Sequence, residues 1–547
     1  MNQRKFRLIL SGFSIKNGSY IRLAGGFGTF LLLLLFLIIP FVLIMTASNR
    51  LLSLFYDKTT LREGIIGQPV SFNPLFSYTN TTDKTLTKLL FRGVTKMSID
   101  GKWHPDLAED ISVSEDGLIY TIKLSDSLYW DDGYRLTTED VLFTYAQIQS
   151  PDYFGYWREA FKGVKFEKKD DLILILTLEE PLSSFYNSLT VGILPKHVLG
   201  NVSVRDMEKS DFNLSPIGNG RFSVENSSVT ENGGGKSNYT ISLLNNNKEA
   251  KIRHVQFRYY ENIESIMLAY KNGEIDSFRY TIPKDIDLLT AWNNYTLHNV
   301  PIAYRSYQIY FKTDLEGPIS NKNVRNALSL SLDRKQLVAN IFNNHASASY
   351  GPIEETSWAY SKDDVVSNYD PEEARRLLSE SDNANLNLTL TAPDTYPSRE
   401  VFEYVKEQWA QIGITLELRL VEPENFERDV IRTRDFQLCF FGQETSLDPD
   451  RYPLWHSTQI KYPGLNISGI SSKRIDKSLE VGRQTYDENK RKEQYIDFQK
   501  YFIEEMPSIY LYHPSYDYLV RNRVKGVKLE NLGLPENRFD SIDEWYL

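Results

Sequence analysis

The alternation of apolar and polar residues between positions 100 and 145 predicts a run of short strands joined by tight turns. Just before position 125 every second residue is apolar, as in a strand with one buried face. These residues are Leu118, Tyr120, Ile122 and Leu124. Asp-Gly pairs, which favour hairpin turns with positive φ angles, stand around this strand at 100–101, 116–117 and 132–133.

The period of the apolar residues changes along the chain. Thr137 or Thr138 can cap a helix after the third turn. Strand patterns then dominate to about residue 303, for example at 172–178 and 254–260. From about residue 321 the period is helical, with apolar faces at 324–332, 374–378 and 401–409. Strands at 386–390 and 414–420 alternate with those helices, which predicts an open α/β sheet.

The first 50 residues differ sharply from the rest. Residues 23–49 carry no charged side chain, and 27–45 are almost wholly apolar, about the length of a membrane-spanning helix. Five basic residues and no acidic one precede this segment, which places the N-terminus in the cytoplasm. We expect an uncleaved single-pass anchor, although Thr46-Ala47-Ser48 leaves a signal-peptidase site open. No cysteine closely follows the segment, which excludes a lipoprotein anchor.

The charge of the remaining chain excludes one class of partner. The first 50 residues hold six of the 62 basic residues and none of the 72 acidic ones, so the rest carries a net charge of −16. Such a surface argues against binding to nucleic acid. It suits a soluble receptor domain with a slight bias toward amine-bearing ligands, although most of these charges are expected to be ordinary solvated surface.

The chain shows no pattern typical of catalysis. Its one cysteine, Cys439, allows no internal disulfide and lies in an apolar run that predicts a buried thiol. Seven histidines are scattered without a metal-ligand spacing, and no Gly-x-Ser-x-Gly elbow is present. We therefore expect neither an enzyme nor a bound metal or other cofactor.

The motifs of the chain resemble, in order, those of the bacterial extracellular solute-binding proteins of family 5, the receptors of oligopeptide, dipeptide and nickel ABC importers. The matching segments are 105–109, 128–133, 136–141, 216–222, 273–276, 323–334, 369–378, 412–414 and 448–450. Nearly everything from about residue 61 to 528 is covered. Arg221 departs from the pattern, because proline is usual at its position.

The resemblance implies an α/β, two-lobe, periplasmic-binding-protein-like (class II) fold with mixed sheets and an extra β-rich subdomain, preceded by one N-terminal transmembrane helix. The expected segments are a basic cytoplasmic tail (1–22), the anchor (23–49), a tether (50–60), lobe 1 (61–303, with an inserted subdomain at about 93–209), lobe 2 (304–504) and a return to lobe 1 (505–547). Hinge motion would close the lobes on a ligand.

The segment 440–450 matters most for the ligand. A strand that ends in glycine and continues into a polar loop presents side chains to a cleft. In peptide-binding relatives an aspartate three residues before the Asp-Pro pair holds the α-ammonium group of the peptide. Thr445 has that position here, and the adjacent Glu444 can substitute. Asp448 either contacts the ligand or simply caps a turn.

Tyrosine and tryptophan suit a pocket that accepts varied side chains, although most aromatic residues are expected to pack in the core or on the surface. The expected ligand contacts are Phe76, Ser77, Tyr78, Tyr307, Gly442, Glu444, Thr445, Asp448, Tyr452 and Trp455.

The predicted function is an extracytoplasmic receptor, monomeric outside the membrane, that passes oligopeptides to the permease and ATPase subunits of an ABC importer. The alternatives are a receptor for another solute, such as a nickel chelate or an oligosaccharide, and a membrane-anchored sensor without transport.

Overall fold

The computed structural model describes residues 58–232, 236–281, 289, 294–363, 369–381, 386–529 and 532–547. The tail at 1–22, the predicted anchor at 23–49 and all but the last three residues of the tether lie outside the described residues. Within the described ranges, no helix is both long enough and apolar enough to cross a bilayer.

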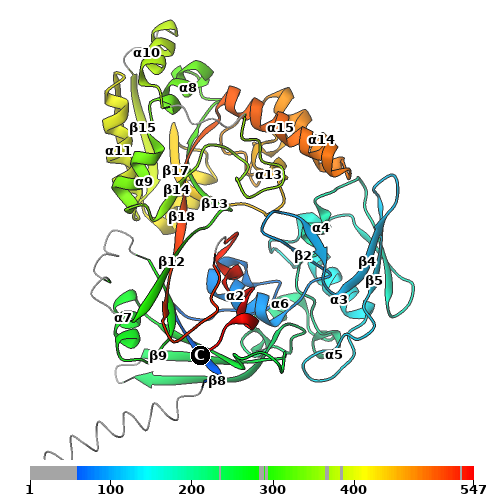
Figure 1. Cartoon of the computed structure of the whole chain (residues 1–547). Helices are drawn as coiled ribbons and strands as arrows, with labels where there is room; N and C mark the ends of the chain where they lie inside the picture. Colours follow the sequence, from blue (N-terminus) through cyan, green and yellow to red (C-terminus); the bar gives the residue numbers. More distant parts are fainter. Residues whose placement is uncertain are drawn as a thin grey trace, which may run out of the picture. The chain divides into compact units, whose positions relative to one another are not determined.

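Twelve strands of the described chain form one mixed sheet (Figure 1). Its order is β16-β15-β17-β13-β18-β11-β1-β10-β9-β8, and β12 and β14 also pair with β18. The strands are β1 (Thr60–Ile66), β8 (Phe222–Asn232), β9 (Lys236–Asn245), β10 (His254–Tyr260), β11 (Ser277–Tyr280), β12 (Tyr295–Pro301), β13 (Arg305–Phe311), β14 (Ala346–Ala348), β15 (Leu386–Pro393), β16 (Ile414–Val421), β17 (Leu438–Glu444) and β18 (Ser508–Arg521).

Strand β18 pairs along both of its edges. β13 and β14 flank its first half, where Tyr307 lies opposite Tyr512. β12 and β11 flank its second half, where Pro301 lies opposite Ser515. Because only residues 302–304 separate β12 from β13, these two strands follow one another along a single edge of β18 (Figure 1). Arg305, the first residue of β13, therefore lies next to the C-terminal end of β17.

A second sheet holds the strands predicted around the Asp-Gly turns. It has the order β4-β5-β7-β6 and is antiparallel throughout. Its strands are β4 (Ala108–Val113), β5 (Ile119–Leu124), β6 (Lys165–Lys168) and β7 (Ile173–Thr177), beside the hairpin β2 (Thr95–Met97) and β3 (Trp103–Pro105). Tyr120, Ile122 and Leu124 are buried, as the alternation predicts. Positive φ angles at Gly101, Gly117 and Gly133 confirm all three turns.

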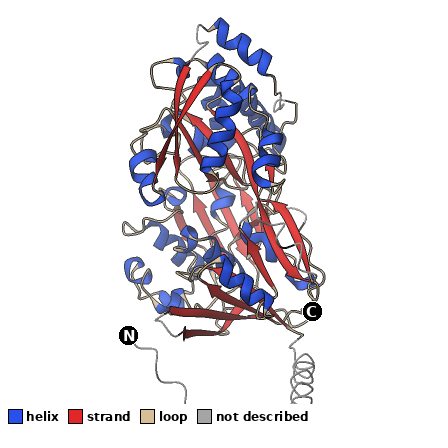
Figure 2. Cartoon of the chain, turned by 90° about the vertical axis from the view of Figure 1, so that its left-hand side faces the viewer, coloured by secondary structure: helices blue, strands red, loops and turns tan. Residues whose placement is uncertain are grey.

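Helices lie where the apolar faces at 324–332, 374–378 and 401–409 and the cap at 137–138 predict them. Thr137 rather than Thr138 is the N-cap of the first helix after the turns, and Asp140 completes its capping box. The described helices are α2 (Thr81–Leu90), α3 (Thr138–Gln149), α4 (Phe185–Ser188), α5 (Lys196–Leu199), α6 (Val204–Met207), α7 (Ile263–Lys271), α8 (Lys322–Leu330), α9 (Arg334–Phe342), α10 (Pro371–Glu380), α11 (Ser398–Ala410), α12 (Pro423–Phe426), α13 (Tyr452–Trp455), α14 (Lys473–Gln484) and α15 (Glu488–Glu505). They flank the strands in Figure 2.

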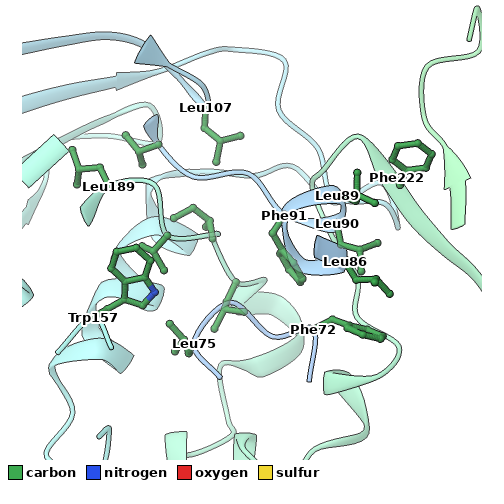
Figure 3. Close-up of a cluster of buried hydrophobic side chains, with 14 of the residues drawn as sticks. Phe72, Leu75, Leu86, Leu89, Leu90, Phe91, Leu107, Trp157, Leu189 and Phe222 are labelled. Atoms are coloured by element: carbon green, nitrogen blue, oxygen red, sulfur yellow. The ribbon is translucent and has the colours of Figure 1, made fainter. Parts of the chain in front are cut away.

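Several hydrophobic cores hold these elements together. The core in Figure 3 joins α2 to the neighbouring loops and strands through side chains such as Phe72, Leu86 and Phe222. A second core lies between β15–β17 and helices α8–α11, and a third surrounds α15. Residues 59–547 form one compact unit. The lobe boundaries at 303 and 504 and the inserted subdomain at about 93–209 stay predictions.

Candidate ligand site

Glu444 is the last residue of β17 and lies between two cations. It is directly opposite Arg305 in the β13–β17 ladder, and Arg305 Nη2 donates to its Oε2 at 2.7 Å. Lys84 Nζ, from α2, donates to the other oxygen at 2.7 Å. Burial opposes ionisation of Glu444, but the two cations outweigh burial and lower its pKa, so the carboxylate is charged at neutral pH. The three side chains remain 20–26% exposed.

Glu536 and Arg279 complete what we call the charged cluster, together with Lys84, Glu444 and Arg305. Burial raises the pKa of Glu536, the charge of Lys84 lowers it, and the charge of Glu444 raises it. Glu536 Oε2 is buried without a hydrogen-bond partner in the described chain. Burial lowers the pKa of Arg279, on β11, and the neighbouring Arg305 lowers it further. The cluster therefore holds both signs of charge at one place.

Aromatic rings from the segment 72–78 and from residues 153–157 lie beside this cluster. Tyr78 stacks on Tyr156 with ring centroids 4.9 Å apart and lies edge-on to Trp157, and Phe76 meets Tyr153 edge-on. Tyr156 is 61% exposed, yet burial and the charge of Glu444 raise its pKa. Both facts agree if Tyr156 has many protein atoms around it while one face of its ring stays open to solvent. Of the predicted contacts in this segment, Tyr78 and Phe76 are half-buried, whereas Ser77 is buried.

Gly442 makes room for Tyr307 on the adjacent strand. The two residues are opposite each other in the β13–β17 ladder, and a Cβ atom on Gly442 would lie 2.7 Å from a ring carbon of Tyr307. The Tyr307 ring stacks on Tyr512 with centroids 4.8 Å apart. Tyr307 is also close enough to Arg279 to act on the pKa of the guanidinium group. The structure thus brings Tyr78, Tyr307, Gly442 and Glu444 to the charged cluster.

Thr445 is bound to a different set of residues. Its hydroxyl donates to Glu354 Oε1 at 2.8 Å, and its backbone N–H donates to Tyr304 O at 2.8 Å. Glu354 Oε2 accepts from Arg451 Nη2 at 2.6 Å, and both of these side chains are buried. At the position where the resemblance implies an aspartate, this chain therefore has a threonine that bonds to a buried, neutralised ion pair.

Asp448 also belongs to a buried ion pair. Its two oxygens accept from the two Nη atoms of Arg491 at 3.0 and 2.7 Å. One of them accepts the backbone N–H of Asp450 as well. Because both oxygens are bound, this geometry favours the structural interpretation of Asp448, and contact with a ligand stays a prediction.

Tyr452 and Trp455 lie on the short helix α13. Tyr452 stacks on His456, and the Arg483 guanidinium carbon lies 4.0 Å from the centroid of its ring. Trp455 is 1% exposed and packs against Tyr310 and Phe502 in the third core. Neither residue has a recorded contact with the charged cluster, so their predicted ligand contacts have no support from this geometry.

A small cavity of about 210 Å³ opens beside Glu354. It is lined by residues from the ends of β12 and β14, the loop 349–360, His513 and Leu532. Burial lowers the pKa of His513, which places a neutral imidazole at this cavity. Of the residues that line this cavity, Glu354 is the one that binds Thr445 and Arg451, whereas the hydroxyls of Tyr350 and Thr356 are buried without a hydrogen-bond partner in the described chain.

Sequence reasoning missed Lys84, Arg279, Tyr156 and Glu536. Each comes from a segment far from Glu444 in the chain, and single charged residues usually predict solvated surface. Arg305 could have been predicted from one pattern. It lies two residues before the predicted contact Tyr307 and therefore on the same face of β13. No three His, Cys, Asp or Glu residues within the described ranges are grouped so that they could hold a metal ion.

Comparisons with known proteins extend over nearly the whole chain. The profile of the bacterial extracellular solute-binding proteins, family 5, matches residues 102–461. The oligopeptide-binding protein AppA of Bacillus subtilis (strain 168) is 27% identical over 514 residues, with 88% of this chain and 91% of that protein covered. The dipeptide-binding protein of Escherichia coli (strain K12) is 24% identical over 524 residues, with 87% of this chain and 93% of that protein covered.

Solved structures resemble the chain as a whole. AppA from Bacillus subtilis in complex with a nonapeptide has a TM-score of 0.68 at 27% identity, covering 89% of this chain and 98% of that one. NikZ from Campylobacter jejuni in complex with Ni(L-His) has a TM-score of 0.71 at 24% identity, covering 90% of this chain and 100% of that one. The second likeness concerns the fold alone.

Proposed function

Because the chain belongs to the bacterial extracellular solute-binding proteins of family 5, we propose that it captures oligopeptides between two lobes and delivers them to the permease of an ABC importer. Its mixed α/β fold is that of the periplasmic binding proteins. The family consists of solute-binding receptors and is not a family of enzymes. ATP hydrolysis then belongs to partner subunits.

The observation that carries the peptide assignment is the charged cluster beside the aromatic rings. A peptide is a zwitterion with an ammonium group at one end and a carboxylate at the other. Glu444 is ionised and partly exposed, and it already accepts a hydrogen bond from the ammonium group of Lys84. The ammonium group of a ligand offers the same charge and the same donors. It can therefore take the place of Lys84 at Glu444 Oε1, while the aromatic rings contact side chains of the peptide.

The lobes that enclose this peptide are 61–303, with the inserted subdomain at about 93–209, and 304–504, with the return at 505–547. β12 and β13 follow one another along one edge of β18. This arrangement supports the division into lobes, because two adjacent long chain segments, β12–β13 and β18, can serve as a hinge. The chain works as a monomer outside the membrane, held by residues 23–49 with residues 1–22 in the cytoplasm. The absence of charge in 23–49 and the basic residues before it support this placement.

Native mass spectrometry of the purified full-length chain tests the assignment through the ligand that co-purifies. We expect a series of peptide masses for the wild type and for Glu417→Gln, which changes an exposed glutamate on β16. In Glu444→Gln the series should be reduced about ten-fold, because a charge-assisted hydrogen bond to the amine is lost.

Other outcomes would overturn parts of this proposal. Equal peptide loading of wild type and Glu444→Gln would overturn the proposed contact between Glu444 and the amine of the ligand, but not the capture of peptides. A metal chelate or a single non-peptide mass would show that the ligand is another solute and not a peptide. An empty protein that peptide pools do not stabilise by about 2–3 kcal/mol, as saturation at a hundred times Kd requires, would favour the sensor.

A further inference from the structure

The cavity of about 210 Å³ lies on the opposite face of the sheet from the charged cluster. Tyr307, on the face of that cluster, is opposite Tyr512 in the β13–β18 ladder, and the two rings stack. His513 follows Tyr512 and is opposite Ser347 of β14, so these two side chains point to the other face, where both line the cavity. The cavity is therefore separate from the proposed amine contact at Glu444.

Polar side chains at this cavity offer hydrogen-bonding capacity that the described chain does not use. The hydroxyls of Tyr350 and Thr356 are buried without a hydrogen-bond partner there. Nδ1 of His513 lies 3.0 Å from the carbonyl oxygen of Arg305, and because a carbonyl only accepts, Nδ1 carries the proton. Burial lowers the pKa of this imidazole and keeps it neutral, so Nε2 is an acceptor. Hydroxyl oxygens also accept, so all three groups can receive N–H donors from a ligand.

The charges that act on the cavity wall are negative. Against the effect of burial, the carboxylates of Glu354 and Glu355 raise the pKa of His513. Burial and then Glu355 raise the pKa of Tyr360, which also lines the cavity. Glu354 is neutralised by its ion pair with Arg451, whereas Glu355 is exposed and forms no ion pair within the described ranges. One uncompensated negative charge therefore lies at this cavity.

We propose that the cavity binds a small organic ammonium ion, such as a protonated primary amine. Its N–H groups donate to the carboxylate of Glu355, to Nε2 of His513 and to the hydroxyl of Tyr350. Its alkyl part contacts Pro301 and Leu532, which line the same cavity. The volume is several times the ~30 Å³ that one water molecule has in the liquid, so an amine of a few carbons fits. A metal ion fits less well, because no three His, Cys, Asp or Glu residues of the described chain are grouped to hold one.

Thermal unfolding of the full-length chain tests this site with butylammonium chloride as the probe. Butylammonium should raise the thermal midpoint of the wild type above that in sodium chloride of equal ionic strength, whereas 1-butanol, which has the same alkyl chain and no charge, should not. Glu355→Gln loses a charge-assisted hydrogen bond and should raise the half-saturating concentration about ten-fold. Tyr350→Phe loses a neutral hydroxyl and should raise it about two- to ten-fold. Glu417→Gln, at an exposed position on β16, should leave it unchanged.

Four outcomes would overturn the site. They are a wild type that butylammonium does not stabilise, equal half-saturating concentrations for wild type and Glu355→Gln, equal stabilisation by 1-butanol, and a response that is lost in Glu444→Gln but kept in Glu355→Gln. The last would place the ammonium ion in the charged cluster. The inference does not rest on the proposed function, because the probe contains no peptide and the ligand that co-purifies tests peptide capture by itself.

Discussion

At the scale of single residues, Asp83 shows how a buried carboxylate fixes the segment that carries Phe76 and Tyr78. It is buried near the start of α2, next to Lys84, and accepts the backbone N–H groups of Val70 and Ser71. Burial raises its pKa to about 6 despite these two hydrogen bonds. The charge is tolerated there because it satisfies two backbone donors that would otherwise be buried unpaired.

This raised pKa predicts a pH dependence of stability. The folded chain holds the Asp83 proton up to about pH 6, whereas the unfolded chain loses it near pH 4, so the contribution of Asp83 to stability declines as the pH rises from about 4 to about 6. Asp83→Asn removes this titration and keeps an acceptor oxygen. Relative to the wild type, its unfolding free energy should rise by about 3 kcal/mol between pH 4 and pH 7.

Urea unfolding at pH 4, 5, 6 and 7 measures this difference. Asp126→Asn, at an exposed position, should follow the wild type at every pH. A difference between wild type and Asp83→Asn that stays constant over this range would show that Asp83 is charged throughout.

At the scale of elements, the tip of the β2–β3 hairpin is fitted closely to the loop after β17. Gly101 has a φ of +84°, and a Cβ atom there would lie 2.3 Å from the carbonyl oxygen of Leu447. The backbone N–H of Trp358 donates to Asp100 O at the same turn. Gly133 has nearly the same φ, +88°, but nothing lies within 4 Å of its Cβ position.

These two turns form a matched pair for mutation. Gly133→Ala should cost about 1–2 kcal/mol of unfolding free energy, because an alanine is strained at positive φ. Gly101→Ala meets the same strain and also displaces Leu447, so it should cost about 1–3 kcal/mol more. Chemical denaturation of both variants measures the difference. Equal losses would mean that the hairpin tip moves away from the loop without cost.

The elements themselves were largely predictable, because their apolar periods are local properties of the sequence. β10, β15 and β16 coincide with predicted strands, and α11 presents Val401, Val405 and Trp409 to the core as its spacing requires. The candidate site was predictable only in part. Glu444 ends an apolar strand and could be proposed from that pattern, and its contact with a ligand stays a prediction. Its partner Lys84 lies 360 positions away and has no local signal.

At the scale of the whole molecule, a buried ion pair joins the two ends of the described body. Arg538 Nε donates to Glu63 Oε1 at 3.2 Å, and both side chains are almost fully buried. The hydroxyls of Tyr518 and Ser277 also donate to Glu63. One carboxylate thereby connects β1, β11, β18 and the C-terminal segment.

Removing the cation should therefore destabilise the entire fold. Arg538→Met leaves Glu63 charged in the core, and we expect a loss of about 3–5 kcal/mol at neutral pH. Arg205→Met, at an exposed pair with Asp152, should cost less than about 1 kcal/mol. Denaturant titrations of both variants at neutral pH measure the difference. A loss in Arg538→Met no larger than that in Arg205→Met would overturn the role of this ion pair.

The same ion pair limits when the core can be completed during synthesis. Glu63 and Arg538 are 475 positions apart, and β1 pairs in parallel with β10 rather than with its neighbour in sequence. This ion pair cannot form until residue 538 has been synthesised, and β1 cannot pair before β10 has been synthesised. The order of synthesis therefore leaves Glu63 without its guanidinium partner until nearly all of the described body is present.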